Sequence, residues 1–288
     1  MDYLIHLAIL FSIYAMLGIT LNVLVGYTGL LSVSHASFFG IGAYGTALLM
    51  VDAHWNFFPA LMLASIVGGM IAYMIGCVLS RFRDDYYALG SLGLNVIIFS
   101  FFLNLQTITR GPLGIPGIVR PNIGSFHFSE NSMFLALVLC ALALLWMFFH
   151  HVTRSSFGMV LRAIREDEDA IQVFGYRTHF FKLAIFVLSA MGASIAGAFF
   201  ASYISYIDPF SFTVNESVFL LALIILGGLA SHTGSVLGAL IFVLLPEALR
   251  FVGFPQEYAA QMRQLVYGVL LIILVLYRPR GIAGTYTF

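Results

Sequence analysis

Nine apolar runs, separated by polar residues or by glycine and proline, follow one another along almost the whole sequence. Backbone N–H and C=O groups find no water inside a bilayer, so a run that crosses it must be a helix of roughly 20 residues. Several runs are shorter, which predicts tilted or broken helices. We predict an all-α integral membrane protein, a polytopic bundle of about eight to ten transmembrane helices. The runs are approximately 3–25, 36–51, 57–79, 86–105, 132–150, 182–205, 216–229, 236–250 and 263–277.

The scarcity of charge supports this prediction. Charged residues make up 9% of the 288 residues and apolar residues 61%. A soluble domain carries about 25% charged residues, so this chain has too few to cover a surface that faces water. The 13 Lys and Arg are balanced by 13 Asp and Glu, which leaves no basic excess for nucleic acid. Composition therefore excludes a soluble enzyme, a disordered chain and a nucleic-acid binder, and predicts one transmembrane domain over residues 1–288.

The positions of the basic residues predict the orientation, because short cytoplasmic loops are enriched in Lys and Arg. With segment 153–182 in the cytoplasm, nine of the thirteen basic residues lie on the inner side. The four that lie outside are Arg110, Arg120, Arg250 and Arg263. This assignment places the C-terminus in the cytoplasm and, if the first run crosses once, the N-terminus outside. No basic region precedes that run, so we expect a retained helix and not a cleaved signal peptide.

Segment 153–182 holds five of the thirteen basic residues and four consecutive acidic residues, 166–169. Between Gly158 and Gly175 the residue types mostly favour helix, and Gly175 is a suitable residue to end it. On one continuous helix Arg162 and Glu166 would lie one turn apart, as would Arg165 and Asp169. The segment is either a solvated loop that only sets the topology or a surface offered to a cytoplasmic partner.

The order acid-Ala-x-x-x-x-Gly at Asp169, Ala170 and Gly175 favours the second alternative. It resembles the EAA signature of ABC importer permeases, in which the signature helix docks in a cleft of the ATPase subunit. This sequence departs from that signature by Asp at 169 and Ile at 171. The residues that we predict to couple the chain to an ATPase are Arg162, Arg165, Glu166, Asp169, Ala170 and Gly175.

Further stretches, collinear over nearly the whole chain, resemble the LivM-type permeases of the branched-chain amino acid ABC importers. They are 26–32 (GYTGLLS), 35–44 (HASFFGIGAY), 161–166 (LRAIRE), 206–212 (YIDPFSF), 226–229 (LGGL) and 278–281 (RPRG). The chain departs from the family pattern at Ala230, where a third glycine is common, and at His232. The proline-containing loop 107–131 matches only loosely, which leaves the substrate and the binding protein open.

The resemblance implies an importer with four membrane-bound parts that works by alternating access. This chain and a second, LivH-type permease would form the pathway in a bacterial inner membrane. Two ABC ATPase subunits would bind ATP and Mg and drive it, so this chain would hold no cofactor and have no catalytic residue. A periplasmic or surface binding protein would deliver a branched-chain or related small amino acid. The only lysine, Lys182, follows Phe181 and forms no phosphate-binding loop.

Polar residues inside the apolar runs are the candidates for a substrate pathway, because such residues are costly in a bilayer and face other helices or a cavity. Hydroxyl and amide groups can replace the water around a zwitterionic amino acid without binding it too tightly for release. The glycine-interrupted stretches 29–37 and 227–235 share a pattern, and such paired interruptions mark substrate regions in transporters. The alternative for each residue is a simple interhelical hydrogen bond. The candidates are Asn22, Ser32, Ser34, His35, Ser37 and Asn95.

Small residues recur every four positions in the run that begins near residue 182. Such spacing lets helix backbones approach closely in a membrane, either within this chain or against the second permease. The predicted packing residues are Ser189, Gly192, Ala193, Ala196 and Gly197. The adjacent histidines His150 and His151 would point about 100° apart on a helix and have no further ligand at suitable spacing, so we expect no metal site.

Two other function classes are weighed against a transport permease. A membrane enzyme, such as a lipid-linked group transferase, would cluster catalytic groups at one membrane face, whereas the acidic cluster here is embedded among arginines. An ion-coupled secondary transporter usually needs an intramembrane carboxylate, and no acidic residue lies in the middle of a run. Among substrates, urea and short amides are the alternative to amino acids.

Overall fold

The computed structural model describes residues 2–82, 84–123, 126–128, 130–251, 259–277 and 281–284. Each of the nine predicted runs is a helix, and the helix ends differ from the predicted ends by at most four residues. The prediction of an all-α, multi-pass membrane protein is confirmed. The helices are α1 (Asp2–Thr28), α2 (His35–Val51), α3 (Phe57–Leu79), α4 (Asp84–Asn104), α6 (Asn131–Arg154), α9 (Thr178–Ile204), α10 (Val214–Gly227), α11 (His232–Phe251) and α12 (Ala259–Tyr277).

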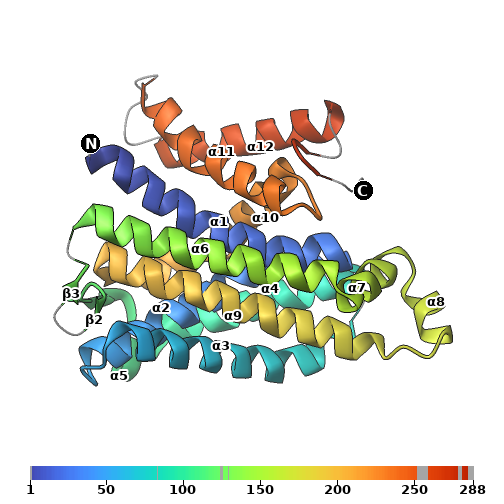
Figure 1. Ribbon diagram of the computed structural model, residues 1–288, viewed down its shortest axis with the longest axis horizontal. Coiled ribbons are helices and arrows are strands. Elements are labelled where there is room, and N and C mark those ends of the chain that lie inside the picture. Colours follow the sequence, from blue (N-terminus) through green and yellow to red (C-terminus); the bar gives the residue numbers. More distant parts are fainter. Residues whose placement is uncertain are drawn as a thin grey trace.

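Shorter elements lie at the two ends of this bundle (Figure 1). At one end are α5 (Gln106–Thr109), η1 (Gly111–Leu113) and two small antiparallel sheets. One sheet pairs β1 (Ile115–Pro116) with β4 (Tyr206–Ile207), and Ile115 lies opposite Ile207. The other pairs β2 (Asn122–Ile123) with β3 (Phe126–His127). At the opposite end, α7 (Ser156–Glu166) and α8 (Glu168–Val173) project beyond the long helices.

The basic residues fall into two groups, one at each end of the bundle. Arg154 ends α6, Arg162 and Arg165 lie in α7, and Lys182 lies in the first turns of α9, all at the α7–α8 end. Arg110 and Arg120 lie in the segments next to η1 and β2, at the other end. Arg83 and the 278–280 part of the RPRG stretch lie outside the described residues.

Five of the described helices, α1, α3, α4, α6 and α9, are long and apolar enough to cross a membrane. Helix α2 has 17 residues and α10 has 14, which at about 1.5 Å per residue is too short for a hydrocarbon core of about 30 Å. Both begin inside the bundle. His35, the first residue of α2, places its Nε2 2.9 Å from Oγ1 of Thr20. Since Thr20 precedes the end of α1 by eight residues, α2 starts about 12 Å inside that end.

Helix α10 starts inside the bundle because the chain before it folds inward. After β4, the short helix η2 (Pro209–Phe212) packs its fully buried Phe212 among aromatic rings of α2, α4 and α9. Asp208 fixes this turn by accepting hydrogen bonds from the backbone N–H and the hydroxyl of Ser211, at 2.9 and 3.0 Å. The consequence is that the first turn of α10 faces the middle of α1.

The five residues predicted for helix packing lie on the side of α9 that packs against this chain's own helices. Ser189 donates to the carbonyl oxygen of Thr20 in α1 at 2.8 Å. A Cβ on Gly192 would meet the methyl group of Thr20, and one on Gly197 would meet the carbonyl oxygen of Phe39 in α2. Ala193 and Ala196 are fully buried. Small side chains therefore bring α9 into backbone contact with α2 and close to α1.

Candidate functional site

The charged segment is two helices and not the single helix expected from its composition. The chain breaks at Asp167, which has an extended backbone (φ −159°, ψ 101°). The Asp167 carboxylate accepts from the backbone N–H of Ala170 at 3.0 Å and thereby caps α8. An aspartate that caps a new helix competes with continuation of the old one. The expected one-turn spacing of Arg165 and Asp169 is therefore wrong; Arg165 pairs with the adjacent Glu166 at 2.9 Å.

Helix α7 is held firmly against the bundle. Its Leu161 and Ile164 are buried, and Gly158 lies so close to the Thr153 backbone of α6 that a Cβ would clash with it. Arg165 donates to the carbonyl oxygen of Gly26 in the last turn of α1 at 2.5 Å. Gly29 (φ +74°) lies against the Arg165 side chain, where an added Cβ would be 3.0 Å from Cγ. These contacts fix α7 against the end of α1.

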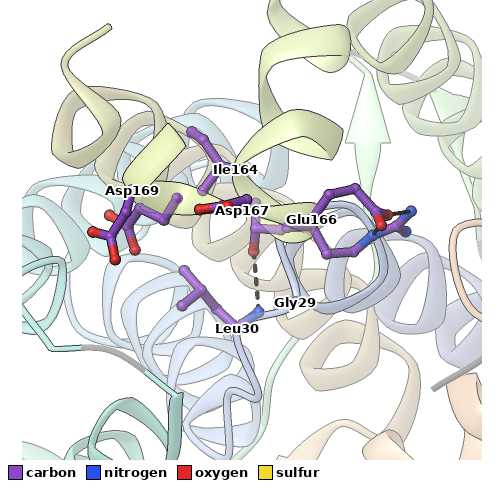
Figure 2. A pocket seen from close by; sticks show the side chains of 9 residues that line it. Gly29, Leu30, Ile164, Glu166, Asp167 and Asp169 are labelled. Atoms are coloured by element: carbon purple, nitrogen blue, oxygen red, sulfur yellow. Dashed lines mark hydrogen bonds and ion pairs between the residues drawn. The ribbon is translucent and has the colours of Figure 1, made fainter. Parts of the chain in front are cut away.

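A cavity of about 230 Å³ separates the end of α1 from the α7–α8 break. Thr28, Gly29 and Leu30 line one side, and residues 164–169, which include the predicted Glu166 and Asp169, line the other (Figure 2). The cavity is polar because four consecutive acidic residues border it. It lies at the junction that a movement of α8 relative to α1 would open or close.

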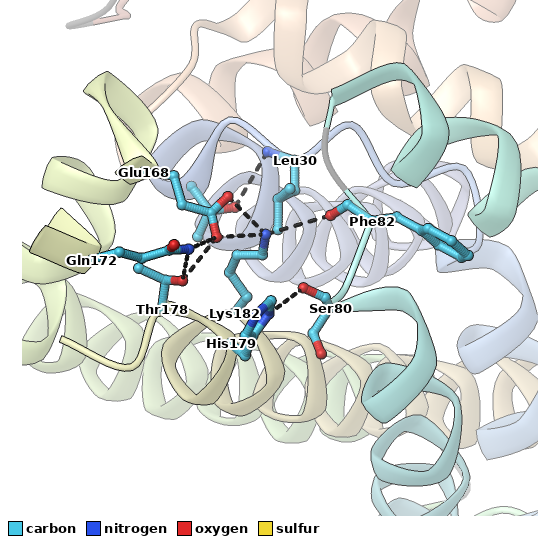
Figure 3. A network of polar contacts seen from close by, with 9 residues as sticks. Leu30, Ser80, Phe82, Glu168, Gln172, Thr178, His179 and Lys182 are labelled. Atoms are coloured by element: carbon cyan, nitrogen blue, oxygen red, sulfur yellow. Dashed lines mark hydrogen bonds and ion pairs between the residues drawn. The ribbon is translucent and has the colours of Figure 1, made fainter. Parts of the chain in front are cut away.

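Helix α8 is tied to α9 by an ion pair that the sequence did not suggest (Figure 3). Nζ of Lys182 lies 3.0 Å from Oε2 of Glu168, and the two side chains are 1% and 16% exposed. Thr178 donates to the same carboxylate at 2.8 Å. Lys182 also reaches the carbonyl oxygen of Phe82, between α3 and α4, at 3.4 Å. The pair therefore joins α8, α9 and the α3–α4 connection. Its only sequence signal was a single lysine placed within an apolar run.

Large apolar side chains are exposed at the tip of α8. Val173 is 86% exposed, Phe174 77% and Tyr176 48%, and Gly175 between them takes a left-handed backbone (φ +88°). This tip lies beyond the ends of the long helices (Figure 1). Apolar groups that gather on a surface outside the hydrocarbon core indicate a binding surface for another protein. The predicted residues Arg162 and Asp169 are exposed on the same segment, and Ala170 is half-buried.

A second polar cluster lies inside the bundle, which we call the polar junction: Val33, Ala36, Ser91, Asn95 and Ser217. Asn95 of α4 donates from Nδ2 to the carbonyl oxygen of Val33 at 2.8 Å and to Oγ of Ser217 at 2.6 Å. The N–H of Ala36, in the first turn of α2, donates to the same Ser217 oxygen at 3.0 Å. Ser91 accepts from the N–H of Val33 at 2.9 Å. The junction joins the non-helical segment 29–34 to α4 and α10.

Four other predicted pathway residues adjoin the junction. Ser32 and Ser34 place their hydroxyl oxygens 3.1 Å apart within the non-helical segment. His35 pairs with Thr20, and Ser37 is fully buried in the first turn of α2. Ser217 was not selected as a pathway residue. The sequence carried no signal for Ser217, because nothing indicated that α10 begins inside the membrane.

Asn22 lies in a different cluster. Its Nδ2 donates to the carbonyl oxygens of Gly228 and Ser231 and to Oγ of Ser235, at 3.1, 2.9 and 2.7 Å. Its Oδ1 accepts from the N–H of Ala230 at 2.9 Å. Asn22 therefore holds the turn between α10 and α11, and its polar atoms are used there. The stretch 227–235, compared above with 29–37, is this turn at the α7–α8 end.

We expect Asn22→Ala to destabilise the protein by about 2–3 kcal/mol, because the buried polar groups of the turn lose their partners. Asn104→Ala is the matched control, since Asn104 is exposed and donates only to Ser100 of its own helix. Thermal unfolding of the purified protein in mild detergent measures both variants. Equal midpoints for Asn22→Ala and Asn104→Ala would contradict the role given to Asn22.

Glu216 lies deeper in the bundle than its position at the start of an apolar run suggests. It stands in the first turn of α10 and accepts from the hydroxyl of Tyr14 at 3.0 Å. Tyr14 is at the midpoint of the 27-residue helix α1. The sequence placed Glu216 at the outer end of a run because the inward fold of η2 was not foreseen. Because Glu216 lies opposite the middle of α1, the absence of acidic residues from the middle of the apolar runs is no argument against ion coupling.

The last described residues cap α10. The N–H groups of Ile282 and Ala283 donate to the carbonyl oxygens of Leu226 and Gly227, at 3.1 and 2.9 Å. This contact brings the 281–284 segment to the end of the bundle that carries α7 and α8 (Figure 1). Within the part of the chain that the structure describes, no three His, Cys, Asp or Glu side chains are grouped to hold a metal ion.

Comparison with known proteins identifies similar sequences over nearly the whole chain. The family model described as "Branched-chain amino acid transport system / permease component" matches residues 3–275. The high-affinity branched-chain amino acid transport system permease proteins LivM of Salmonella typhimurium and Escherichia coli are each 33% identical over 301 residues, covering 96% of this chain and 69% of theirs. The probable LivM of Methanocaldococcus jannaschii is 26% identical over 234 residues, covering 77% and 67%. No solved structure matches.

Proposed function

This chain belongs to the branched-chain amino acid permease family of the ABC importers, and from that premise we propose that it forms half of a pathway that carries branched-chain or related small amino acids into a bacterial cell. The proposed partner across the pathway is a LivH-type permease. Two ABC ATPase subunits supply the energy and hold the ATP and Mg. A periplasmic or surface binding protein delivers the amino acid at the β2–β3 end.

The observation that carries this proposal is the α7–α8 segment. Its tip exposes Val173 and Phe174 beyond the bundle, while its base is tied to α1 through Arg165 and to α9 through Lys182. A force applied to the tip by an ATPase is therefore transmitted to two of the longest helices. This arrangement supports the assignment of Asp169, Ala170 and Gly175 to ATPase coupling, together with Arg162 and Glu166. It also supports a cytoplasmic position for this end and for the C-terminus.

The pathway that we propose passes the break between α1 and α2. Ser32, Ser34, His35, Ser37 and Asn95 offer hydroxyl, imidazole and amide groups there without a net charge. Alternating access would widen this region to one side at a time as the α7–α8 segment moves. Asn22 is left out of this pathway, because all its polar atoms hold the α10–α11 turn.

The test of the proposed function is purification of the tagged chain in mild detergent from its native membrane. We expect a second permease and two P-loop ATPases to copurify, and ATP-dependent uptake of leucine after reconstitution with the binding protein. Competition by urea and short amides measures the substrate range. Recovery of the chain alone, with uptake that follows an ion gradient in the absence of ATP, would replace this proposal by secondary transport.

Removing the Phe174 side chain at the tip of α8 should weaken attachment of the ATPases. Exposed aromatic residues that become buried at an interface are commonly worth about 2 kcal/mol or more, so Phe174→Ala is expected to weaken ATPase attachment by about 30-fold. Asp169→Lys should act in the same direction by reversing a charge on the same surface. Phe101→Ala is the matched control, because Phe101 is a 57% exposed phenylalanine within α4. Copurified ATPase per permease is the measurement, and equal ratios for Phe174→Ala and Phe101→Ala would contradict the docking role.

A further inference from the structure

The polar junction is built where two short helices begin inside the membrane. The first turns of α2 and α10 meet there, since the N–H of Ala36 donates to Oγ of Ser217. Each helix N-terminus carries a partial positive charge, which comes from its unpaired N–H groups. Neither end is capped by its own N-cap residue, because Ser34 and Thr213 make no side-chain hydrogen bond to their helices. The N-terminal ends of α2 and α10 therefore meet near the middle of the bundle. The first turn of α2 has no acidic residue, and in the first turn of α10 the Glu216 carboxylate accepts from Tyr14 of α1.

Asn95 adds a group of opposite polarity at the same place. Both hydrogen bonds of its Nδ2 go to junction atoms, so the carboxamide that also carries Oδ1 lies at the junction. This oxygen is fully buried and has no hydrogen-bond partner among the described residues. The same is true of Oγ of Ser37, the residue after Ala36. Buried polar atoms are almost always paired, so an unpaired acceptor requires an explanation.

A free acceptor beside two positive helix ends matches the two charged groups of an amino acid. An ammonium group carries three N–H donors and suits an orphan amide oxygen, whereas a carboxylate suits the N-termini of half-helices. A neutral amide and hydroxyls bind such a zwitterion without the strong hold of a fully charged pair. Weak binding is what a transport pathway requires, because the substrate must leave again.

We propose that the polar junction is the transient binding site for the backbone of the transported amino acid. The ammonium group is bound by Oδ1 of Asn95, and the carboxylate faces the N-termini of α2 and α10 at Ser217. The inference rests on the proposed transport function and deepens it by naming the groups that recognise the substrate. Entry of the amino acid replaces the Asn95–Ser217 and Ala36–Ser217 hydrogen bonds, so occupation of the site loosens α4 from α2 and α10.

The test uses the intact importer in lipid nanodiscs without its binding protein, with radiolabelled L-leucine as the probe. Isoamylamine, which lacks the carboxylate, and 4-methylpentanoate, which lacks the ammonium group, are the competitors. We expect each to bind at least about 10-fold more weakly than leucine, the effect of losing one hydrogen bond to a charged group. Asn95→Leu should weaken leucine binding by about 10- to 100-fold. Asn95→Asp, which keeps the acceptor and adds a charge, should shift the preference toward isoamylamine.

Matched controls lie on the same helix. Asn104→Leu and Ser100→Ala remove an amide and a hydroxyl whose hydrogen bonds stay within α4, and they should leave leucine binding unchanged. Ser217→Ala serves as a second junction variant if Asn95→Leu does not assemble, with a loss of leucine binding expected.

Three outcomes overturn the proposal. The first is wild-type leucine affinity in the junction variants, which would mean that an ordered water satisfies Asn95. The second is competition by both analogues as strong as that by leucine, and the third is no binding of leucine by the unsubstituted importer up to about 10 mM. Failure of the proposed function is separate, since it appears as an unsubstituted complex without ATPase subunits.

Discussion

Lys182→Met is expected to destabilise the protein by about 3 kcal/mol and to abolish coupled transport. The substitution leaves the Glu168 carboxylate, 16% exposed, without the cation that compensates it. Breaking a buried ion pair from one side is strongly destabilising for this reason. It also releases α8 from α9, so movement of the ATPases would no longer reach that helix. The measurements are the thermal midpoint of the purified importer and the amount of amino acid transported per ATP hydrolysed.

Two comparisons distinguish the buried charge from a general effect. Asp52→Asn removes a carboxylate that is 54% exposed and pairs with the 41% exposed Arg110, and exposed pairs contribute about 0–1 kcal/mol. The double variant Lys182→Met/Glu168→Gln removes both charges of the pair and should regain much of the stability while coupling stays low. A double variant as unstable as Lys182→Met would show that packing of the lysine stem, and not the charge, is what matters.

Gly197→Leu should prevent the chain from accumulating in the membrane. A Cβ at this position would meet the carbonyl oxygen of Phe39 and lie 2.8 Å from the backbone nitrogen of Ala43. Both atoms belong to the α2 backbone and cannot rotate away, so α2 and α9 would have to separate. Overpacking of a side-chain core costs about 1–3 kcal/mol, and a clash with helix backbone should exceed that range.

Gly93→Leu is the control for this prediction. An added Cβ at Gly93 has no atom within 4 Å, although Gly93 also lies in an apolar membrane helix. Quantitative immunoblotting of membranes, followed by size-exclusion chromatography in detergent, compares the two variants. Comparable amounts of monodisperse Gly197→Leu and Gly93→Leu protein would refute the close packing of α2 against α9.

Helix positions were predictable because a bilayer offers backbone N–H and C=O groups no hydrogen-bond partners outside the chain itself. All nine apolar runs became helices with ends within four residues of those expected, since an apolar run in a membrane can satisfy its N–H and C=O groups only within itself. The α7–α8 break was missed for the opposite reason. Outside the hydrocarbon core the backbone has other partners, and the side chain of Asp167 supplies one of them.

The sequence could not show which side chains contact each other in the folded chain. Asn22 and Asn95 look alike in sequence, each an amide within an apolar run, yet one holds the α10–α11 turn and the other joins α4 to the starts of α2 and α10. In the sequence, Glu168 counts only as one of four consecutive acidic residues, and Lys182 only as a basic residue that belongs to no phosphate-binding loop. Their pairing depends on the reversal of the chain direction between α8 and α9, which no local sequence pattern predicts.

Local sequence was enough to predict the membrane class, the number and limits of the apolar helices, and the family. These follow from local properties: apolar length, scarcity of charge, and motifs written in consecutive residues. The three-dimensional contacts were needed to show that α2 and α10 begin inside the bundle, that Glu216 lies opposite the middle of α1, and which polar atoms form hydrogen bonds with each other. Those features depend on contacts between residues up to about 200 positions apart, and a hydrogen bond of that kind leaves no pattern in either of the two segments that it joins.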